Sequence, residues 1–221
     1  MTTRLPMFPL NTVLFPGAVL PLHVFEPRYR ALVQSLLEQT DPSRRLFGTV
    51  AIREGYEVGD HGAQSLYRVG CLLQLVEVEA DDDGTFTIEV VARDRIRLDR
   101  LDGDGDFPVG EVVDLPTEDE DVDATQVEAA LTAFDAYRRT ISEIAEDPFE
   151  GSLPRDPTYL SWTLAAAAPL PLPDRQSLLE ADSATERLAL VTDLLRGEVR
   201  AMRVLPSLPA TEVARTRWSP N

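Results

Sequence analysis

The amino end of the chain consists of short apolar runs that prolines interrupt. Two of these runs, Leu5–Leu10 and Ala18–Phe25, flank a turn at Phe15-Pro16-Gly17, and a helix-like segment begins after Glu26-Pro27. Proline lacks the backbone N–H that a β-ladder needs. Strands made from these residues must therefore be edge strands, bent or bulged, and a continuous helix is excluded. Gly17 supplies the φ freedom of a tight turn. The stretch predicts a small, strongly curved sheet.

Up to residue 115 the chain continues mainly in runs of period two. Apolar and polar residues alternate clearly from Phe86 to Val90, and Asp83-Gly84 before them is a strong hairpin signal. Arg28–Gln39 instead repeats its apolar residues at helical spacing. Residues 54–65, with three glycines, are predicted to be a loop. The predicted strands are Leu46–Ile52, Tyr67–Glu79, Thr85–Arg93, Arg95–Leu101 and Phe107–Leu115.

From Asp121 onward the apolar residues recur every 3.6 positions, which predicts helices. Two of the helix starts are spaced as capping boxes, Thr125 with Glu128 and Ser183 with Glu186. Turn residues and charges at 116–123 mark the boundary between the halves. The sequence thus predicts an α+β fold, a curved sheet followed by a helical bundle. The predicted helices run from Thr125 to Pro148, after Asp156-Pro157, over Asp174–Glu180 and from Ser183 to about Met202.

The motif order at the amino end resembles the Lon substrate-binding domain, the amino-terminal PUA-like module of Lon proteases. That family opens with Leu-Pro-Leu-Phe-Pro-Leu, a Phe-Pro-Gly turn, Leu-Pro-Leu-His and Phe-Glu-Pro-Arg-Tyr-Arg. The corresponding residues here are Leu5–Leu10, Phe15-Pro16-Gly17, Leu20–His23 and Phe25–Arg30. The resemblance implies a PUA-like curved β-barrel or pseudo-barrel followed by a C-terminal helical bundle, and a role in holding polypeptide substrates.

Later strands carry the resemblance further. Val69-Gly70 and the Asp83-Gly84 hairpin match the family, while Ala92 stands where the family has glycine and Ile96 where it has an aromatic residue. These two departures bear on the local shape of one strand. They do not affect the expected fold.

The helical half resembles the family at Gln176–Glu180 and Glu186-Arg187-Leu188. In all, the resemblance covers about residues 4–205. It implies three parts: a barrel and substrate-binding lobe at 1–117, a helical bundle at 118–205 and a tail at 206–221 that contains Trp218.

Composition disfavours several classes of partner. The net charge is −17, and no basic residue occurs between Leu101 and Tyr137. Such a field repels phosphate, so nucleic acid is disfavoured. The single cysteine, Cys71, excludes an internal disulfide and is typical of a reducing cytosol. No apolar run approaches the roughly 18 residues of a membrane span, and prolines break the signal-like start. A cytoplasmic protein without a membrane partner is expected.

Residue types also exclude the other activities of a Lon protease. All 21 basic residues are arginine. A Walker loop needs a lysine at the β- and γ-phosphates, and a serine–lysine peptidase needs a lysine base. We therefore expect neither activity, and predict a stand-alone, non-enzymatic binding domain.

Other catalytic or ligand-binding patterns fail as well. His23 and His61 have no Gly-x-Ser-x-Gly elbow beside them, and Cys71 lies in an apolar strand where thiols are usually inert. Asp102–Asp106 lacks the glycine and glutamate that an EF-hand requires at positions 107 and 113. No catalytic residue, metal or cofactor is predicted.

Peptide capture calls for an accessible apolar groove or an unpaired strand edge. We predict that side chains left exposed by the curved sheet supply it, although for either Phe25 or Tyr29 a place in the core is the favoured interpretation. Ion pairs near this corner are expected to fix the backbone, each worth ~0–1 kcal/mol if exposed. The candidate peptide-binding residues are Phe15, Phe25, Tyr29 and Tyr56, and the corner residues are Glu26, Arg28 and Arg30.

The leading functional hypothesis is a polypeptide-binding protein of quality control, an adaptor or holdase. Its partners would be unfolded or exposed segments, with a protease or chaperone as a further partner. One alternative is an RNA-binding PUA-like module that uses an arginine stripe. Another is a small-molecule sensor with an apolar pocket between the lobes. The stripe consists of Arg93, Arg95, Arg97 and Arg100.

Overall fold

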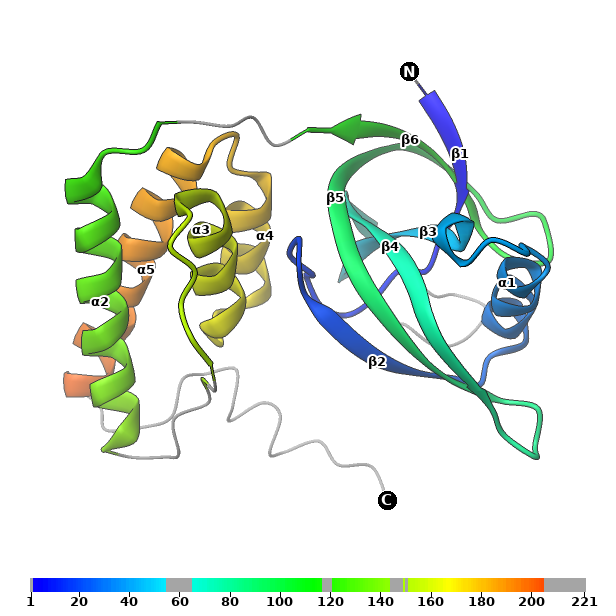
Figure 1. Cartoon of the computed structure of the whole chain (residues 1–221), viewed down its shortest axis with the longest axis horizontal. Helices are drawn as coiled ribbons and strands as arrows, with labels where there is room; N and C mark the ends of the chain where they lie inside the picture. Colours follow the sequence, from blue (N-terminus) through cyan, green and yellow to red (C-terminus); the bar gives the residue numbers. More distant parts are fainter. Residues whose placement is uncertain (1, 55–64, 117–120, 144–148, 150, 205–221) are drawn as a thin grey trace. The chain divides into compact units, whose positions relative to one another are not determined.

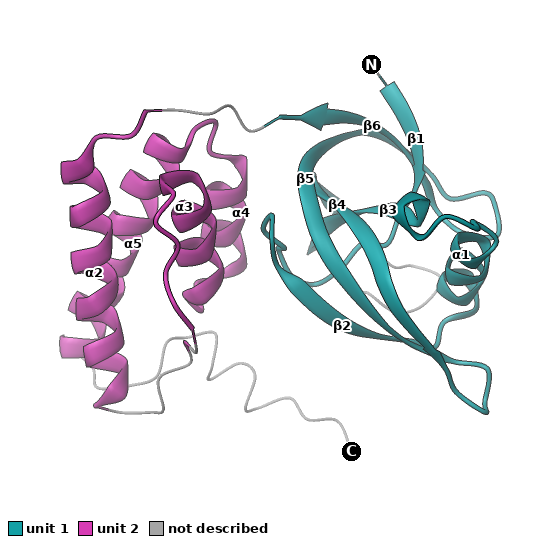
Figure 2. Ribbon diagram, in the orientation of Figure 1, with its two compact units in different colours: residues 1–117 teal, residues 118–221 magenta. Residues whose placement is uncertain are grey.

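The computed structural model describes residues 2–54, 65–116, 121–143, 149 and 151–204. The chain divides into two compact units, unit 1 at residues 1–117 and unit 2 at residues 118–221 (Figure 2). Unit 1 is rich in strands and unit 2 is helical. None of the described helices has the length and apolar character needed to cross a membrane. Tyr56, His61 and the tail with Trp218 lie outside the described residues.

Unit 1 is organised around one antiparallel sheet of six described strands (Figure 1). The order along the sheet is β1-β6-β5-β4-β3. The first half of the long strand β5 pairs with β2, and its second half pairs with β6. The strands are β1 (Thr2–Pro6), β2 (Val19–Val24), β3 (Leu46–Glu54), β4 (Ser65–Ala80), β5 (Phe86–Asp102) and β6 (Val109–Leu115).

The sheet curves until the residues after β1 meet β3. Isolated parallel bridges join Met7 to Gly48 and Leu10 to Ala51. Phe8 N also donates to Gly48 O at 2.8 Å. Because these are isolated bridges, the barrel is incompletely closed. The predicted α+β class, with a curved pseudo-barrel before the helices, is confirmed.

Met7 lies at the centre of one apolar cluster inside this barrel and is fully buried. The barrel wall approaches it closely at two glycines. A Cβ on Gly48 would lie 2.5 Å from Met7 Sδ, and one on Gly110 would lie 2.7 Å from Met7 Cγ. Glycine at both positions therefore makes room for the methionine. The other buried members of the cluster are Val50, Ile96, Leu98 and Val112.

A helix, α1 (Pro27–Leu37), and a single 3-10 turn, η1 (Pro42–Arg44), connect β2 to β3. Proline at the first position of α1 suits the helical φ, and its missing N–H would be unsatisfied there in any case. The buried stripe of α1 packs its Tyr29 ring 3.9 Å from the Phe8 ring, centroid to centroid. The stripe consists of Tyr29, Leu32, Val33 and Leu36.

Strand β5 corrects one expectation. The sequence predicts two strands, Thr85–Arg93 and Arg95–Leu101, but the structure has one continuous strand, Phe86–Asp102. Its pairing with β4 shifts register between the pairs Leu73–Ala92 and Cys71–Arg95. A bulge of this kind admits an extra residue without ending the strand, so the break in alternation bends β5.

Unit 2 contains four described helices, with α5 in contact with the other three. Two of the predicted helix starts, at Asp156 and at Ser183, are confirmed. Asp156 accepts hydrogen bonds from Thr158 N and Tyr159 N, and Ser183 Oγ accepts one from Glu186 N at 3.0 Å. The helices are α2 (Ala124–Ser142), α3 (Pro157–Ala167), α4 (Leu172–Glu180) and α5 (Ala184–Val204).

The N-cap of the first helix of unit 2 lies two residues before the predicted one. The N-cap of α2 is Asp123, whose Oδ1 accepts from both the backbone N and the Oγ1 of Thr125 at 2.8 Å. The prediction that Thr125 and Glu128 form a capping box is therefore wrong. An aspartate is an equally good cap and was available just upstream.

A buried arginine ties three helices of unit 2 together. Arg187 of α5 is 0% exposed, and its guanidinium lies 3.1 Å from the ring centroid of Trp162 in α3. It donates to Ser161 Oγ at 2.8 Å, to Leu178 O at 3.3 Å and to Ala181 O at 3.3 Å. Two of these bonds go to carbonyls at the carboxyl end of α4, where the last carbonyls of a helix have no partner within the helix.

Candidate functional site

The structure separates the four predicted peptide-binding aromatics. Phe15 and Tyr29 are only 1% and 3% exposed, so both belong to the core. Phe25 is 50% exposed, and Tyr56 lies outside the described residues. The expectation that the sheet leaves Phe15 accessible is corrected, because its turn folds onto β5 through a Gly17 N to Ala92 O hydrogen bond of 2.9 Å.

The predicted ion pair at the corner after β2 is present. Arg28 Nε and Nη2 both lie 3.0 Å from Glu26 Oε2, and the Arg28 guanidinium lies 4.6 Å from the Tyr29 ring centroid. Arg30 lies at the β4–β5 hairpin, where a Cβ on Gly84 would be 3.6 Å from Arg30 Nη1. The ion pair joins two of the three predicted corner residues, and the role of the three in fixing the corner stays a prediction.

Four residues at alternate positions form an outward-facing line along β2 and the residue that follows it, and we call it the β2 row: Val19, Pro21, His23 and Phe25. Val19 is 55% exposed, and the residues between them face inward. The His23 and Phe25 rings stack at 6.1 Å between centroids and 27° between planes. The row thus presents apolar and aromatic surface on a strand. His23 is an exposed member of this row.

One edge of β2 faces away from the sheet. Among the described strands β2 pairs only with β5, and Ala92 N donates to Ala18 O at 2.8 Å. Hydrogen-bonded pairs recur at every second residue of an antiparallel ladder, so Val19, Pro21 and His23 direct their backbone groups away from β5. Pro21 has no N–H to offer there, as is usual for proline in an edge strand. The outer edge can still offer its carbonyl groups and two N–H donors, those of Val19 and His23, to a further strand.

Beside the β2 row, the outer face of β5 and β4 is hollowed to a volume of about 390 Å³. The register places Glu89 of β5 between Pro21 and Glu77 of β4, and Glu79 also lines the cavity. A register shift between Leu75 and Glu77 bends β4 at this point. We call the site lined by Pro21, Glu77, Glu79 and Glu89 the acidic hollow.

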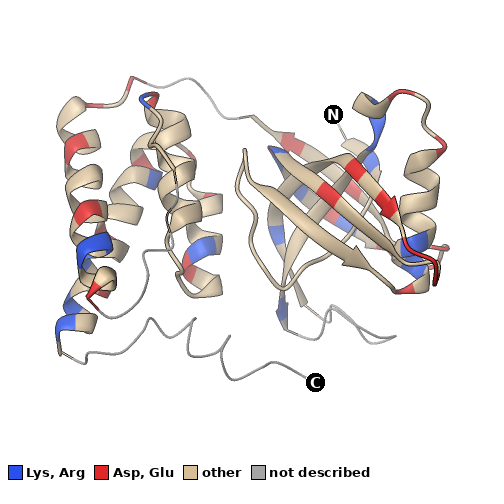
Figure 3. Cartoon of the chain, turned by 60° about the horizontal axis from the view of Figure 1, so that its bottom comes forward, with Lys and Arg blue, Asp and Glu red and all other residues tan. Residues whose placement is uncertain are grey.

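No arginine among the described residues pairs with the carboxylates of the acidic hollow. Arg93, further along β5, instead gives its Nε and Nη2 to Gln74 Oε1 at 3.0 and 2.7 Å. Glu77 and Glu89 stand directly opposite each other, an arrangement that destabilises a sheet. Figure 3 shows acidic positions along the strands of unit 1. The hollow is therefore a concentrated, uncompensated negative site.

The hairpin next to the hollow adds fixed negative charge. Thr85 donates to Asp83 Oδ1 from its Oγ1 at 2.7 Å and from its N at 3.0 Å. These two bonds lower the pKa of the Asp83 carboxyl below its usual value. Asp81 Oδ2 also accepts from Thr85 Oγ1, at 3.1 Å.

The sequence did not single out the acidic hollow. Glu77 and Glu79 occupy alternate positions of β4, which is the ordinary pattern of a solvated strand face, and Glu89 stands alone on β5. The three glutamates come together only through the pairing register of β4 with β5, and the bulge in β4 sets that register locally.

The arginine stripe of the RNA hypothesis does not form. Arg95 is 4% exposed, while Arg93 is bonded to Gln74 and Arg97 Nε lies 3.0 Å from Asp99 Oδ1. The bulge in β5 turns Arg95 to a covered face, opposite Cys71. The structure therefore offers no continuous basic face along β5.

Cys71 is a buried thiol. Its side chain is 0% exposed, and its Sγ donates to Leu14 O at 3.2 Å. Burial raises the pKa of the Cys71 thiol to about 12. A neutral, inaccessible thiol is a poor nucleophile, which agrees with the sequence-based interpretation.

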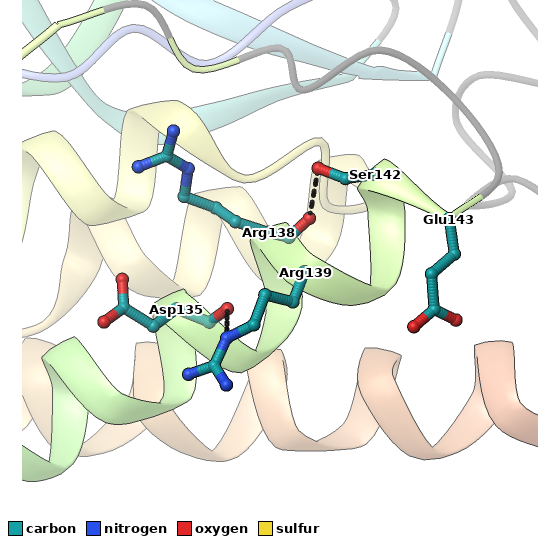
Figure 4. Close-up of a pocket in the computed structure, with 5 residues that line it drawn as sticks. All are labelled: Asp135, Arg138, Arg139, Ser142 and Glu143. Atoms are coloured by element: carbon teal, nitrogen blue, oxygen red, sulfur yellow. Dashed lines mark hydrogen bonds between the residues drawn. The ribbon is translucent and has the colours of Figure 1, made fainter.

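A second hollow, of about 340 Å³, lies on α2 (Figure 4). Its arginines, Arg138 and Arg139, point away from each other, and Arg139 Nε is bonded to Asp135 O at 3.2 Å. The Arg138 guanidinium lies 5.1 Å from the Phe149 ring centroid. Because acids and bases mix in the lining, this hollow has no clear charge preference.

Comparisons with known proteins agree on one family. A family model described as the ATP-dependent protease La (LON) substrate-binding domain matches residues 4–197. The Lon protease of Escherichia coli K12 is 27% identical over 91% of this chain and 26% of its own length. Lon protease 2 of Syntrophobacter fumaroxidans is 30% identical over 86% of this chain and 24% of its own length. The chain thus spans about a quarter of these relatives.

Solved structures agree with the fold. A Lon N-terminal domain protein from Xanthomonas campestris superposes with a TM-score of 0.64 at 25% identity, covering 86% of this chain and 98% of that one. The N-terminal domain of a Mycobacterium avium complex Lon protease gives a TM-score of 0.62 at 21% identity, covering 88% of this chain and 98% of that one. With the family match extending over most of its length, the chain belongs to the Lon substrate-binding domain family.

Proposed function

We propose that this chain is a non-catalytic polypeptide-binding protein that takes up unfolded or exposed segments through unit 1. Residues 1–117 then form the substrate-binding lobe, and residues 118–205 form a supporting helical bundle. Family membership supports this role. So does the lack of lysine, because neither a Walker loop nor a serine–lysine dyad can be assembled from these 221 residues.

The observation that carries the proposal is the β2 row. It combines exposed apolar side chains with a strand edge that has no second strand among the described residues. Extended polypeptides bind such edges by adding a strand, with alternate side chains meeting the neighbouring row. An adaptor or holdase acting in the cytoplasm, alone or with a protease or chaperone, would need a surface of this kind.

Fluorescence anisotropy of labelled, unfolded casein tests the proposal. We expect saturable binding that Phe25→Ser weakens at least threefold, on the order of the loss when one exposed apolar contact is removed. Tyr159→Ser is the matched control, because Tyr159 is an aromatic that is 66% exposed but lies in unit 2. Equal losses for the two variants, or no binding at high micromolar concentration, would contradict the proposal.

A further inference from the structure

We propose that the acidic hollow makes this protein selective for extended polypeptide segments in which arginine or lysine alternates with apolar residues. The inference rests on the proposed function and specifies which segments are preferred. An apolar edge alone would hold many unfolded chains. The carboxylates beside it are what distinguish basic segments from the others.

The β2 row provides the apolar half of the recognition. Side chains on one face of an extended chain recur about every 6.8 Å, the spacing of alternate residues in β2 itself. A strand added at the outer edge would therefore bring its alternate side chains beside Val19, Pro21, His23 and Phe25 in turn. The two ends of the row, Val19 and Phe25, are both at least half exposed. Apolar ligand side chains would be favoured at these ends.

Pro21, in the middle of the β2 row, lies next to the carboxylates of the acidic hollow. Glu89 lies directly across from Pro21, and Glu77 lies directly across from Glu89. An added strand would be two strand spacings, about 10 Å, from β5, so only a long side chain crossing Pro21 could approach Glu89. Arginine and lysine have that length. Arginine also matches a carboxylate with two parallel hydrogen bonds.

Charge complementarity supports a cationic ligand group. Glu77 and Glu89 oppose each other, Glu79 lines the same cavity, and no described arginine compensates them. The described residues include no cluster of three or more acidic, histidine or cysteine side chains suited to a metal ion. A basic side chain entering the hollow would relieve the repulsion between the two carboxylates. The same field would repel segments rich in acid.

The test uses three fluorescein-labelled peptides with the same alternating framework of valine, phenylalanine and threonine. They differ only at two central positions, two residues apart, which are both arginine, both glutamine or both glutamate. We expect the affinity order arginine, glutamine, glutamate for the full chain. Raising the salt concentration from about 50 to 300 mM should reduce the differences in affinity between the peptides and leave the affinity of the glutamine peptide unchanged, because salt screens only the interactions between charges.

The double variant Glu77→Gln/Glu89→Gln removes two of the three carboxylate charges of the hollow and keeps its shape. It should weaken binding of the arginine peptide about fivefold, as expected for two partly exposed ion pairs. Binding of the glutamine peptide should not change. The double variant should be at least as stable to heat as the unmodified protein, because a like-charge pair is removed.

The charge-matched control is Asp106→Asn/Asp114→Asn, which neutralises two exposed acids of unit 1 outside the hollow. It should leave the arginine preference intact. If both double variants lose the preference equally, the net charge causes it and the inference is wrong. If the glutamine and arginine peptides bind equally, the inference fails and the proposed function stands. If no peptide binds, both fail.

Discussion

The two units differ in what they expose, although each buries an arginine, Arg95 in unit 1 and Arg187 in unit 2. Unit 2 encloses a charged side chain, Arg187, and uses it to join α3, α4 and α5. Unit 1 leaves Val19 exposed on β2 and Phe25 exposed directly after it, and it places two carboxylates opposite each other on the neighbouring strands β4 and β5. The exposed large apolar residues of unit 2, Tyr159 and Val204, lie instead in the first turn and at the end of a helix.

Under the proposed function, this difference would separate a part shaped for stability from a part shaped for contact with other molecules. A fully buried arginine bonded to two other helices can hold them together but is not accessible to a ligand. An exposed apolar row and an uncompensated acidic hollow do nothing for the stability of unit 1. The most sensitive positions of unit 2 should therefore lie in its interior, and the most sensitive binding positions of the chain should lie on unit 1.

The largest effect is expected at the buried arginine. Arg187→Ala removes bonds to Ser161, Leu178 and Ala181 and leaves a cavity, so unit 2 should lose about 4 kcal/mol of unfolding free energy. Hydrogen exchange read by mass spectrometry should show faster exchange in unit 2 and unchanged strands in unit 1. The control Arg196→Ala, on the exposed side of the same helix, should cost less than about 0.5 kcal/mol. A loss below about 1 kcal/mol for Arg187→Ala would break the comparison.

The next largest effect is expected in unit 1, where backbones approach most closely. A Cβ on Gly70 would lie 1.8 Å from Thr49 O of the paired strand, so Gly70→Ala must push β3 and β4 apart. We expect a loss of about 3 kcal/mol in unit 1 alone, measured by urea denaturation with hydrogen exchange as the local readout. Gly103→Ala, whose added Cβ would meet nothing within 4 Å, should be nearly neutral. Similar losses for both variants would refute the packing argument.

High pH should destabilise unit 1 through Cys71. Burial raises the thiol pKa from 9.0 to about 12, so the folded state holds its proton more tightly than the unfolded state. This contribution is complete below pH 9 and is lost as the pH rises, by about 1.4 kcal/mol per unit between pH 9 and 12. Thermal unfolding of the protein and of Cys71→Ala should give curves whose separation narrows across that range. Parallel curves would contradict the prediction.

The smallest effect concerns a helix cap in unit 2. Asp156→Ala removes the acceptor for Thr158 N and Tyr159 N and should cost about 1 kcal/mol. Trp162 fluorescence during denaturation follows α3, with Trp218→Phe as the background. Asp156→Asn keeps an oxygen acceptor and should recover most of the loss. If the two substitutions are equally costly, the carboxylate acts through its charge instead of its hydrogen bonds.

Much of the fold could be predicted from the sequence because the local signals agree. Period-two alternation, the Asp83-Gly84 hairpin and helix caps such as Asp156 and Ser183 all correspond to observed elements. The prediction was wrong where tertiary pairing overrides a local break. The bulge after Ala92 keeps β5 continuous, and the alternation alone suggests two strands.

The candidate site could be predicted only in part. Phe25 was named and is exposed, whereas Phe15 is covered, and whether either binds peptide stays a prediction. Glu77 and Glu89 are distant in sequence and meet only through the pairing of β4 with β5. The burial of Arg187 was not predicted, because arginine is normally exposed. Its spacing of three residues from Ala184 and four from Val191 nevertheless places it on the buried stripe of α5.

The most direct test of the central claim is hydrogen exchange of the full chain with and without a saturating arginine peptide. If unit 1 binds polypeptide at the outer edge of β2, the amides of Val19 and His23 should exchange more slowly in the complex. Those of α2 and α5 should not change. Protection confined to unit 2, or bound peptide with no protection in β2, would contradict the account.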